Sequence, residues 1–364
     1  MSAENDVAGS DIIIASAGLV TPVGLSLKET AASARARVAR LREIDWRDRR
    51  FEPFIVGTVP DEGLPELAAP LSEQPLQTRE VRMLRLAHAA LEEALAPVAA
   101  DWAARKQRVP LALGLPEHHT TQPLDPKRFV ARLDQQCPDT LDLAASVAAP
   151  RGRAAGLLAL RHALQWLAEG KHPYVLVGGV DSLVDLYVLG TLDMEQRVRG
   201  ETVSDGFTPS EGAAFLLLTT AQEAGVGRLP KLAQVLGAAA GKESGHLYAE
   251  EPYRGDGLAA ACAQLFEQSP PPQPVATVYC SFNGERYWAR EFGVARIREA
   301  AAFEPDAAME HPAEVFGDLG AAHGAALLAL AAHGVREGYR RAPCLVYASS
   351  DHADRGAALL ARLA

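Results

Sequence analysis

Short apolar runs alternate along the chain with longer segments whose apolar positions recur at helical spacing. The short runs predict buried strands at residues 11–15, 109–115, 174–177 and 213–219. Residues 81–96 repeat Leu and Ala every three or four positions, which predicts an amphipathic helix ending at Pro97. Residues 156–168 are apolar nearly all round and predict a buried helix. The alternation predicts an α/β fold with a mostly parallel sheet and helices on its faces.

The same alternation starts again after Pro230. Strands are expected at residues 231–236, 275–279 and 345–348, with the last of these as the final strand. Helices are expected at residues 258–268 and 319–330. We therefore predict two similar halves, with the division between residues 1–225 and residues 226–364.

Composition narrows the functional class. The 364 residues are 48% hydrophobic and carry a formal net charge of -10. An acidic balance argues against binding to nucleic acid or to an anionic membrane surface. No apolar run reaches the roughly 18 residues that a membrane helix needs, and residues 1–10 lack the basic start of a signal peptide. We expect a cytoplasmic protein with neither nucleic acid nor membrane as a partner.

Few residues have the spacing of a metal or redox site. The cysteines form no CxxC pair and have no zinc-ligand spacing with histidine, so we interpret them as reduced thiols; they are Cys137, Cys262, Cys280 and Cys344. Cys280 ends a predicted strand and is either a nucleophile or an inert buried thiol, the commoner case. Glu117, His118 and His119 are either a metal fragment or a polar loop, and the absence of an evident third ligand favours the loop. We predict no cofactor and no metal.

Five motifs follow one another in a fixed order. In the first half, residues 19–24 read LVTPVG, residues 152–156 read GRAAG, residues 175–179 read VLVGG and residues 205–213 read DGFTPSEGA. In the second half, residues 317–324 read GDLGAAHG. The order and spacing of these motifs resemble those of the β-ketoacyl synthases, which carry V-T-P-x-G, A-C-x-S-G, A-G-G, D-G-F-x-x-G-E-G-A and G-H-x-x-A-A-x-G. The resemblance implies the thiolase-like fold, with two pseudo-symmetric halves in αβαβα layers, and a homodimer formed through sheet edges.

The residues that the condensing reaction needs are replaced at the matching positions. The resemblance implies a cysteine thiolate at the start of the buried helix and two histidines that stabilise the enolate. This chain has Arg153, Asn283 and Asp318 there. The glycine-rich C-terminal loop of the family matches residues 349–356 (SSDHADRG), which lack those glycines. Arginine stays protonated and cannot be acylated, so we assign no catalytic residue.

The three replacements suggest a compensating cluster. Arg153 would place a cation at a helix N-terminus and away from water, which the helix dipole and desolvation both oppose. Because the family's catalytic residues share one cavity, we predict an Arg153–Asp318 ion pair with Asn283 hydrogen-bonded alongside. Arg153 is then a plug or an anion binder, and Asp318 a structural partner or a general base. Glu285 and Arg286 are expected near the substrate entrance, where their charge argues against a carrier-borne substrate.

Three functions remain open. The first is a binding, scaffold or adaptor protein without condensing activity, whose partner is itself in a homodimer, a ketosynthase that it serves as a chain-length-factor-like subunit, or a secretion effector. The second is an acyltransferase or 3-oxoacyl synthase-related enzyme with altered chemistry at Asp318, Cys280 or Ser146. The third is an ordinary condensing enzyme whose motifs align in another register. The sequence predicts the first.

Overall fold

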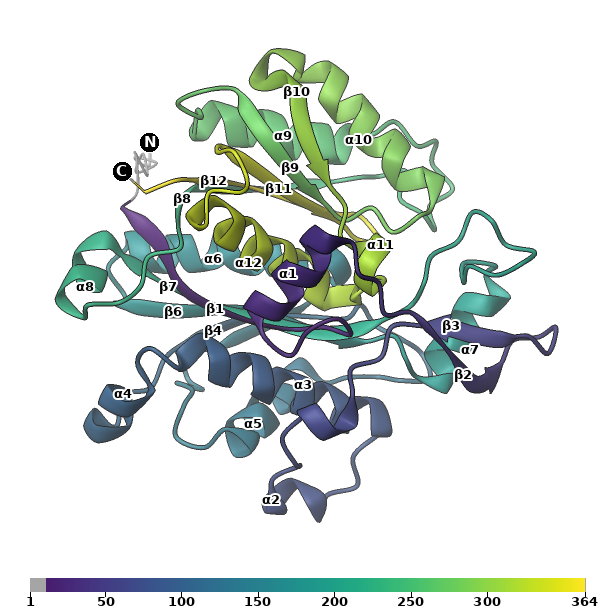
Figure 1. The fold of residues 1–364 in the computed structure, drawn as a ribbon, viewed down its shortest axis with the longest axis horizontal. Coiled ribbons are helices and arrows are strands. Elements are labelled where there is room, and N and C mark those ends of the chain that lie inside the picture. The colour runs from purple at the N-terminus through teal and green to yellow at the C-terminus, as the bar shows by residue number, and fades with distance from the viewer. Residues whose placement is uncertain (1–10, 364) are drawn as a thin grey trace.

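A mixed ten-stranded sheet organises the chain. The structure is a computed structural model that describes residues 11–363, so the expectation for residues 1–10 lies outside the described residues. The strand order is β10-β9-β11-β12-β8-β1-β7-β6-β4-β5. A separate hairpin, formed by β2 (Arg42–Arg47) and β3 (Pro53–Val56), lies beside α7 (Leu186–Met194) (Figure 1).

The two halves of the sheet repeat one topology. The first half contains β1 (Ile12–Val20), β4 (Leu111–Leu115), β5 (Val147–Pro150), β6 (Tyr174–Ser182) and β7 (Glu211–Thr220). The second contains β8 (Ala233–Lys242), β9 (Val275–Cys280), β10 (Phe303–Glu310), β11 (Cys344–Ser349) and β12 (Asp354–Ala361). In each half the order of these five strands is first, fifth, fourth, second, third, with the same pattern of parallel and antiparallel pairs. β1 and β8 pair antiparallel and join the halves. The boundary at residue 225 stays a prediction.

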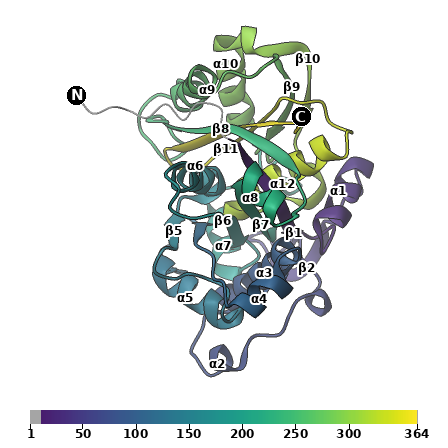
Figure 2. The ribbon, with the colours of Figure 1, turned by 90° about the vertical axis from the view of Figure 1, so that its left-hand side faces the viewer.

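Helices form three layers around the two half-sheets. One outer layer contains α3 (Thr78–Leu95), α4 (Ala99–Arg105) and α5 (Pro126–Gln136), and the other contains α9 (Asp256–Gln268) and α10 (Arg286–Arg298). Between the half-sheets lie α6 (Ala155–Ala168) and α12 (His323–Arg336) (Figures 1 and 2). The remaining helices are α1 (Leu27–Ala36), α2 (Ala69–Ser72), α8 (Ala221–Val226) and α11 (Ala313–Phe316). This is the αβαβα arrangement predicted from the resemblance.

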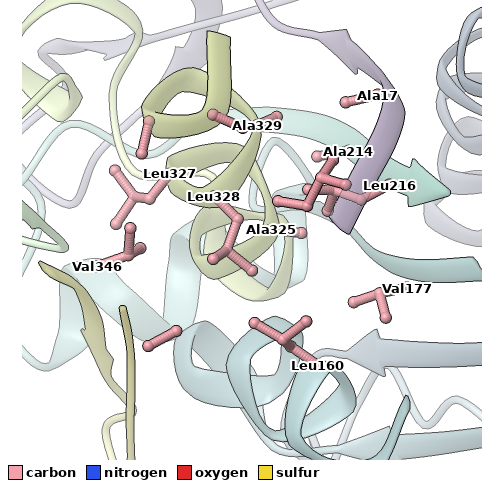
Figure 3. Packing of buried hydrophobic residues seen from close by; sticks show 14 of the residues in the cluster. Ala17, Leu160, Val177, Ala214, Leu216, Ala325, Leu327, Leu328, Ala329 and Val346 are labelled. Carbon is pink, nitrogen blue, oxygen red and sulfur yellow. The ribbon is translucent and has the colours of Figure 1, made fainter. Parts of the chain in front are cut away.

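The central layer is packed from small side chains. Along α12, Ala325, Leu328 and Ala329 have no more than trace solvent exposure. Figure 3 shows these residues between Leu160 of α6 and Leu216 of the first half-sheet. A helix enclosed on all sides needs an apolar surface all round, and α12 is buried at nearly every position. The burial expected for residues 156–168 holds for one face of α6 only, because Arg161, His162, Gln165 and Ala168 are exposed. In the described residues, no helix is both long and apolar enough to cross a membrane.

Three sequence expectations need correction. The sheet was expected to be mostly parallel, but β1–β7, β6–β7, β1–β8, β8–β12 and β11–β12 pair antiparallel. The helix expected at residues 319–330 begins as a 3₁₀ turn, Gly320–Ala322, and becomes the α-helix α12 only at His323. The run at residues 345–348 is not the final strand, because β12 follows it. β12 opens with Asp354 and Arg355, whose charges are typical of a loop, but the Arg355 side chain is buried against Glu291.

Candidate functional site

Arg153, Asn283 and Asp318 meet in the interior between the halves. Arg153 lies in a 3₁₀ turn before α6, Asn283 follows β9, and Asp318 lies between α11 and α12. Arg153 Nε donates to Asp318 Oδ2 at 2.6 Å, and Asn283 Nδ2 donates to the same oxygen at 2.8 Å. Arg153 is 5% exposed and Asp318 is 1% exposed. The structure therefore contains the ion pair and the amide contact that the sequence predicts.

Close contact between α6 and α12 fixes the backbone of this site. A Cβ on Gly156 would lie 2.6 Å from the backbone nitrogen of Ala325, so only glycine lets the two helices approach so closely. Both helices begin near the site, and their N-terminal N–H groups favour negative charge. Asp318 benefits from this arrangement, since its Oδ1 accepts the backbone N–H of Gly320 at 2.9 Å. The same N–H groups disfavour the positive charge of Arg153, so nearby carboxylates must compensate that charge.

A second arginine and two further carboxylates complete the cluster, and the sequence interpretation did not include them as partners. Arg197 donates to both oxygens of Glu285 at 2.8 and 2.9 Å. It also donates to both oxygens of Asp351 at 2.8 and 3.0 Å. Asp351 accepts a further bond from Arg153. We call Arg153, Arg197, Asn283, Glu285, Asp318 and Asp351 the buried charge cluster.

The position of Glu285 corrects an expectation. Its side chain does not lie at an entrance but points inward, where it is 8% exposed and accepts from Asn283 Nδ2 at 3.0 Å and from Trp288 Nε1 at 2.9 Å. Arg286 does lie at the surface, where it pairs with Asp205. The sequence feature that could have indicated this inward position is the NGERY segment, in which Glu285 stands two residues after Asn283.

The charges in the cluster nearly balance. Two guanidinium groups face three carboxylates, and the ring of Phe207 lies near both guanidiniums, with its centroid 5.5 Å from Arg153 Cζ and 5.2 Å from Arg197 Cζ. Burial alone would raise the pKa of the Asp318 carboxyl, but Arg153, His323 and Asn283 together outweigh burial and hold that pKa well below its ordinary value. Burial opposes ionisation of Asp351 too, and Arg153 and Arg197 together lower its pKa. Both carboxylates are therefore ionised at neutral pH.

The donors near the start of α6 already have partners. The backbone N–H of Ala154 donates to Ser350 Oγ at 3.0 Å. Ser350 Oγ in turn donates to the backbone oxygen of Arg151. Ser350 lies in residues 349–356, the segment that the resemblance aligns with the family's glycine-rich loop. The Ser350 hydroxyl therefore accepts the hydrogen bond of the Ala154 amide, which would otherwise be free to donate into the site.

The two alternative nucleophiles, Cys280 and Ser146, both have side chains that contact backbone groups. Cys280 is fully buried, its Sγ lies 3.3 Å from the backbone oxygen of Glu310, and burial raises the pKa of its thiol to about 12. A thiol with that pKa is almost entirely protonated at neutral pH. Ser146 Oγ donates to the backbone oxygen of Asp142 at 2.7 Å and accepts the N–H of Leu111.

Glu117, His118 and His119 lie in the loop after β4 and have different partners. Glu117 contacts His352 at 3.2 Å, and His119 contacts Thr191 at 3.2 Å. Among residues 11–363, no group of three or more His, Cys, Asp or Glu side chains has a metal-binding arrangement. The three residues thus form part of a polar loop.

A family model matches part of the first half of the chain. Residues 144–224 match the family model of the β-ketoacyl synthase N-terminal domain. That segment contains the turn with Arg153, the buried helix α6 and the DGF motif. No curated protein sequence matches the chain significantly.

Solved structures match over nearly the whole length. The ishigamide ketosynthase/chain length factor has a TM-score of 0.80 at 14% identity, covering 97% of this chain and 99% of that one. An oxazolomycin ketosynthase domain from Streptomyces albus JA3453 has a TM-score of 0.79 at 14% identity, covering 98% of this chain and 75% of that one. A ketosynthase in complex with its chain length factor from Xenorhabdus doucetiae has a TM-score of 0.76 at 16% identity, covering 100% of both chains. The protein has the thiolase-type fold of the ketosynthases and is ketosynthase-like, as its motifs predict.

Proposed function

We propose that the protein is a ketosynthase homologue without condensing activity that acts as a binding or scaffold subunit. The buried charge cluster carries this proposal. Arg153 occupies the position of the nucleophile, and a guanidinium that stays protonated cannot hold an acyl group. Asn283 and Asp318 occupy the histidine positions and already hydrogen-bond each other. The hydrogen-bonding groups of the site satisfy one another and not a substrate.

The proposed partner is a second chain of the same fold, either an active ketosynthase or another copy of this chain. Two matched structures are named for the pairing of a ketosynthase with a chain length factor. In this chain β5 is the edge strand of the first half-sheet (Figure 2). Val147 on β5 and Leu143 before it are 43% and 42% exposed. A free strand edge with exposed apolar residues favours pairing with another strand. We expect the pairing to occur in the cytoplasm.

A condensation assay tests the catalytic half of the proposal. The purified chain is incubated with a malonyl carrier protein and an acyl thioester, and products are followed by mass spectrometry. We expect neither carbon dioxide release nor chain extension. Any condensation by the chain alone that is lost in Cys280→Ser or another cysteine variant would overturn the proposal.

Co-expression tests the partner half. A ketosynthase encoded beside this gene is expressed with and without the chain, and the mixture is analysed by size-exclusion chromatography with light scattering. A one-to-one complex that changes the length of the product supports a chain-length-factor-like subunit. Association with a secretion effector and with no ketosynthase would support the adaptor form. A chain that stays monomeric with both partners contradicts the binding role.

A further inference from the structure

A second group of charged side chains lies away from the buried charge cluster, around the C-terminal end of α1. They line a surface pocket with about 70 Å³ of free volume between α1, the end of β10, α11 and the segment after α12. Its charged and polar lining residues are Arg35, Arg37, Glu310, His311, Glu314, Tyr339 and Arg340. None of these residues belongs to the ketosynthase motifs of the sequence.

The positive charges of the pocket are not all matched by carboxylates. Arg340 Nη2 pairs with Glu310 at 2.7 Å, and Arg37 lies 3.8 Å from Glu314. Within residues 11–363, Arg35 has no acidic partner within 4.0 Å. Its guanidinium instead lies 4.2 Å from the centroid of the Tyr339 ring. The pocket thus has one uncompensated cation in a chain whose net charge is -10.

Two buried polar atoms in the same lining have no hydrogen-bond partner. They are Arg340 Nε and His311 Nδ1. Buried polar atoms in native proteins nearly always have a partner, and leaving one without a partner costs about 1–3 kcal/mol. His311 Nε2 lies 3.5 Å from Glu314 Oε2. A proton on Nε2 would leave Nδ1 as an acceptor, so the pocket offers donors from two arginines and an acceptor from a histidine.

A structural role explains only part of this arrangement. Arg35 lies in the last turn of α1, where a cation interacts favourably with the helix dipole. That role accounts for a positive charge at this position. It does not account for the unpartnered atoms of Arg340 and His311, which come from other segments.

We propose that the pocket binds a small oxyanion of the phosphate class, held by Arg35, Arg340 Nε and His311. A free volume of about 70 Å³ holds a few waters, since one water needs roughly 10–15 Å³ by this measure, and so it fits a phosphate group rather than a large cofactor. Guanidinium groups match phosphate oxygens well. Hydrogen phosphate also carries an O–H group that can donate to His311 Nδ1, which sulfate and acetate lack near neutral pH. The site is independent of the proposed scaffold function.

Isothermal titration calorimetry with inorganic phosphate tests the site. Sulfate and acetate are titrated in parallel at the same ionic strength, which is set with chloride. The variants are Arg35→Gln and Arg35→Lys, with Arg161→Gln as the control because Arg161 is an exposed arginine of α6 outside the pocket. Unfolding midpoints without phosphate show whether each variant is folded.

We expect the wild type to bind phosphate more tightly than sulfate or acetate. Arg35→Gln should weaken phosphate binding at least tenfold, Arg35→Lys should weaken it less, and Arg161→Gln should leave it unchanged. Absence of phosphate binding by the wild type, or equal binding by folded Arg35→Gln, overturns the proposal. Equal or tighter binding of sulfate or acetate overturns the assignment to phosphate.

Discussion

Arg153 remains charged in the interior because its guanidinium forms ion pairs with both Asp318 and Asp351. Desolvating an ion costs several kcal/mol, and a buried pair offsets that cost without necessarily adding net stability. Removing one partner is different, because the remaining charge stays buried and unpaired. The cluster is therefore best tested by removing single charges.

Asp318→Asn should destabilise the protein strongly. The substitution keeps the size of the side chain but leaves Arg153 with one carboxylate, and we expect a loss of about 3–5 kcal/mol in the free energy of unfolding. Urea denaturation followed by circular dichroism measures the loss. Asp306→Asn is the matched control, because Asp306 is 80% exposed in its ion pair, and surface substitutions usually change stability by less than about 0.5 kcal/mol. Equal midpoints for the two variants would contradict a role for the ion pair.

The same carboxylates predict an acid-dependent loss of stability. Their pKa values are lower in the folded chain than the ordinary value of 3.8. A group with a lowered folded pKa stabilises the fold above its unfolded pKa, and this contribution disappears as pH falls toward the folded pKa. The difference in unfolding free energy between wild type and Asp318→Asn should be constant from pH 7 to 5. Below pH 4 it should shrink by up to about 1.4 kcal/mol per pH unit. A difference that grows on acidification would refute this assignment.

The sequence could predict some members of the cluster and not others. The resemblance aligns Arg153, Asn283 and Asp318 with the family's catalytic residues, so their meeting was predicted. Arg197 and Asp351 are 154 positions apart in the chain, and neither carries a pattern that identifies its partner. Contacts of that kind depend on how loops meet in the fold, which local periodicity does not report.

Close backbone contacts between elements give a prediction for the glycines. A Cβ on Gly179 of β6 would lie 2.5 Å from the backbone oxygen of Ala321, and backbone atoms cannot move aside as a flexible side chain can. We expect Gly179→Ala to destabilise the fold by about 1–3 kcal/mol. Gly190→Ala in α7 meets nothing within 4 Å and should stabilise the fold by about 0.5–1 kcal/mol, since alanine is the better helix former. Thermal unfolding measures both changes, and a neutral effect at Gly179 would contradict the packing described.

Elements with a buried apolar pattern were predictable, and elements without one were not. The strands β4, β6 and β7 and the helices α6 and α9 all have runs of buried residues. The β2 strand reads REIDWR, in which Ile44 and Trp46 alternate with charged residues, and it is exposed at five of its six positions. Two apolar residues at alternate positions are a weak signal, so the β2–β3 hairpin was not predicted from hydrophobic periodicity.

Across the whole molecule, the buried charge cluster joins the two halves. Arg153 and Arg197 come from the first half, and Glu285, Asp318 and Asp351 come from the second. Each ion pair of the cluster therefore crosses between halves. We infer that the cluster holds the two halves in register at the interior site between them.

At the first-half end of the ten-stranded sheet, β5 is the edge strand. The N–H groups of successive strand residues point to opposite edges, so alternate residues of β5 can bond to another strand, whereas Pro150 at its end has no N–H to donate. Val147→Lys places a charge on this edge, and edge lysines oppose strand pairing. We expect Val147→Lys to weaken association with the partner chain at least tenfold while leaving the unfolding midpoint of the isolated chain within error.

Val226→Lys is the matched control, because Val226 is 77% exposed on α8, which lies away from β5. It introduces the same charge and removes the same apolar side chain, so only the location differs. Light scattering over a concentration series measures the dissociation constant of each variant, first with the chain alone and then with the co-expressed ketosynthase. If Val147→Lys and Val226→Lys associate as the wild type does, β5 is not the interface. If only self-association is lost, the partner through β5 is a second copy of this chain.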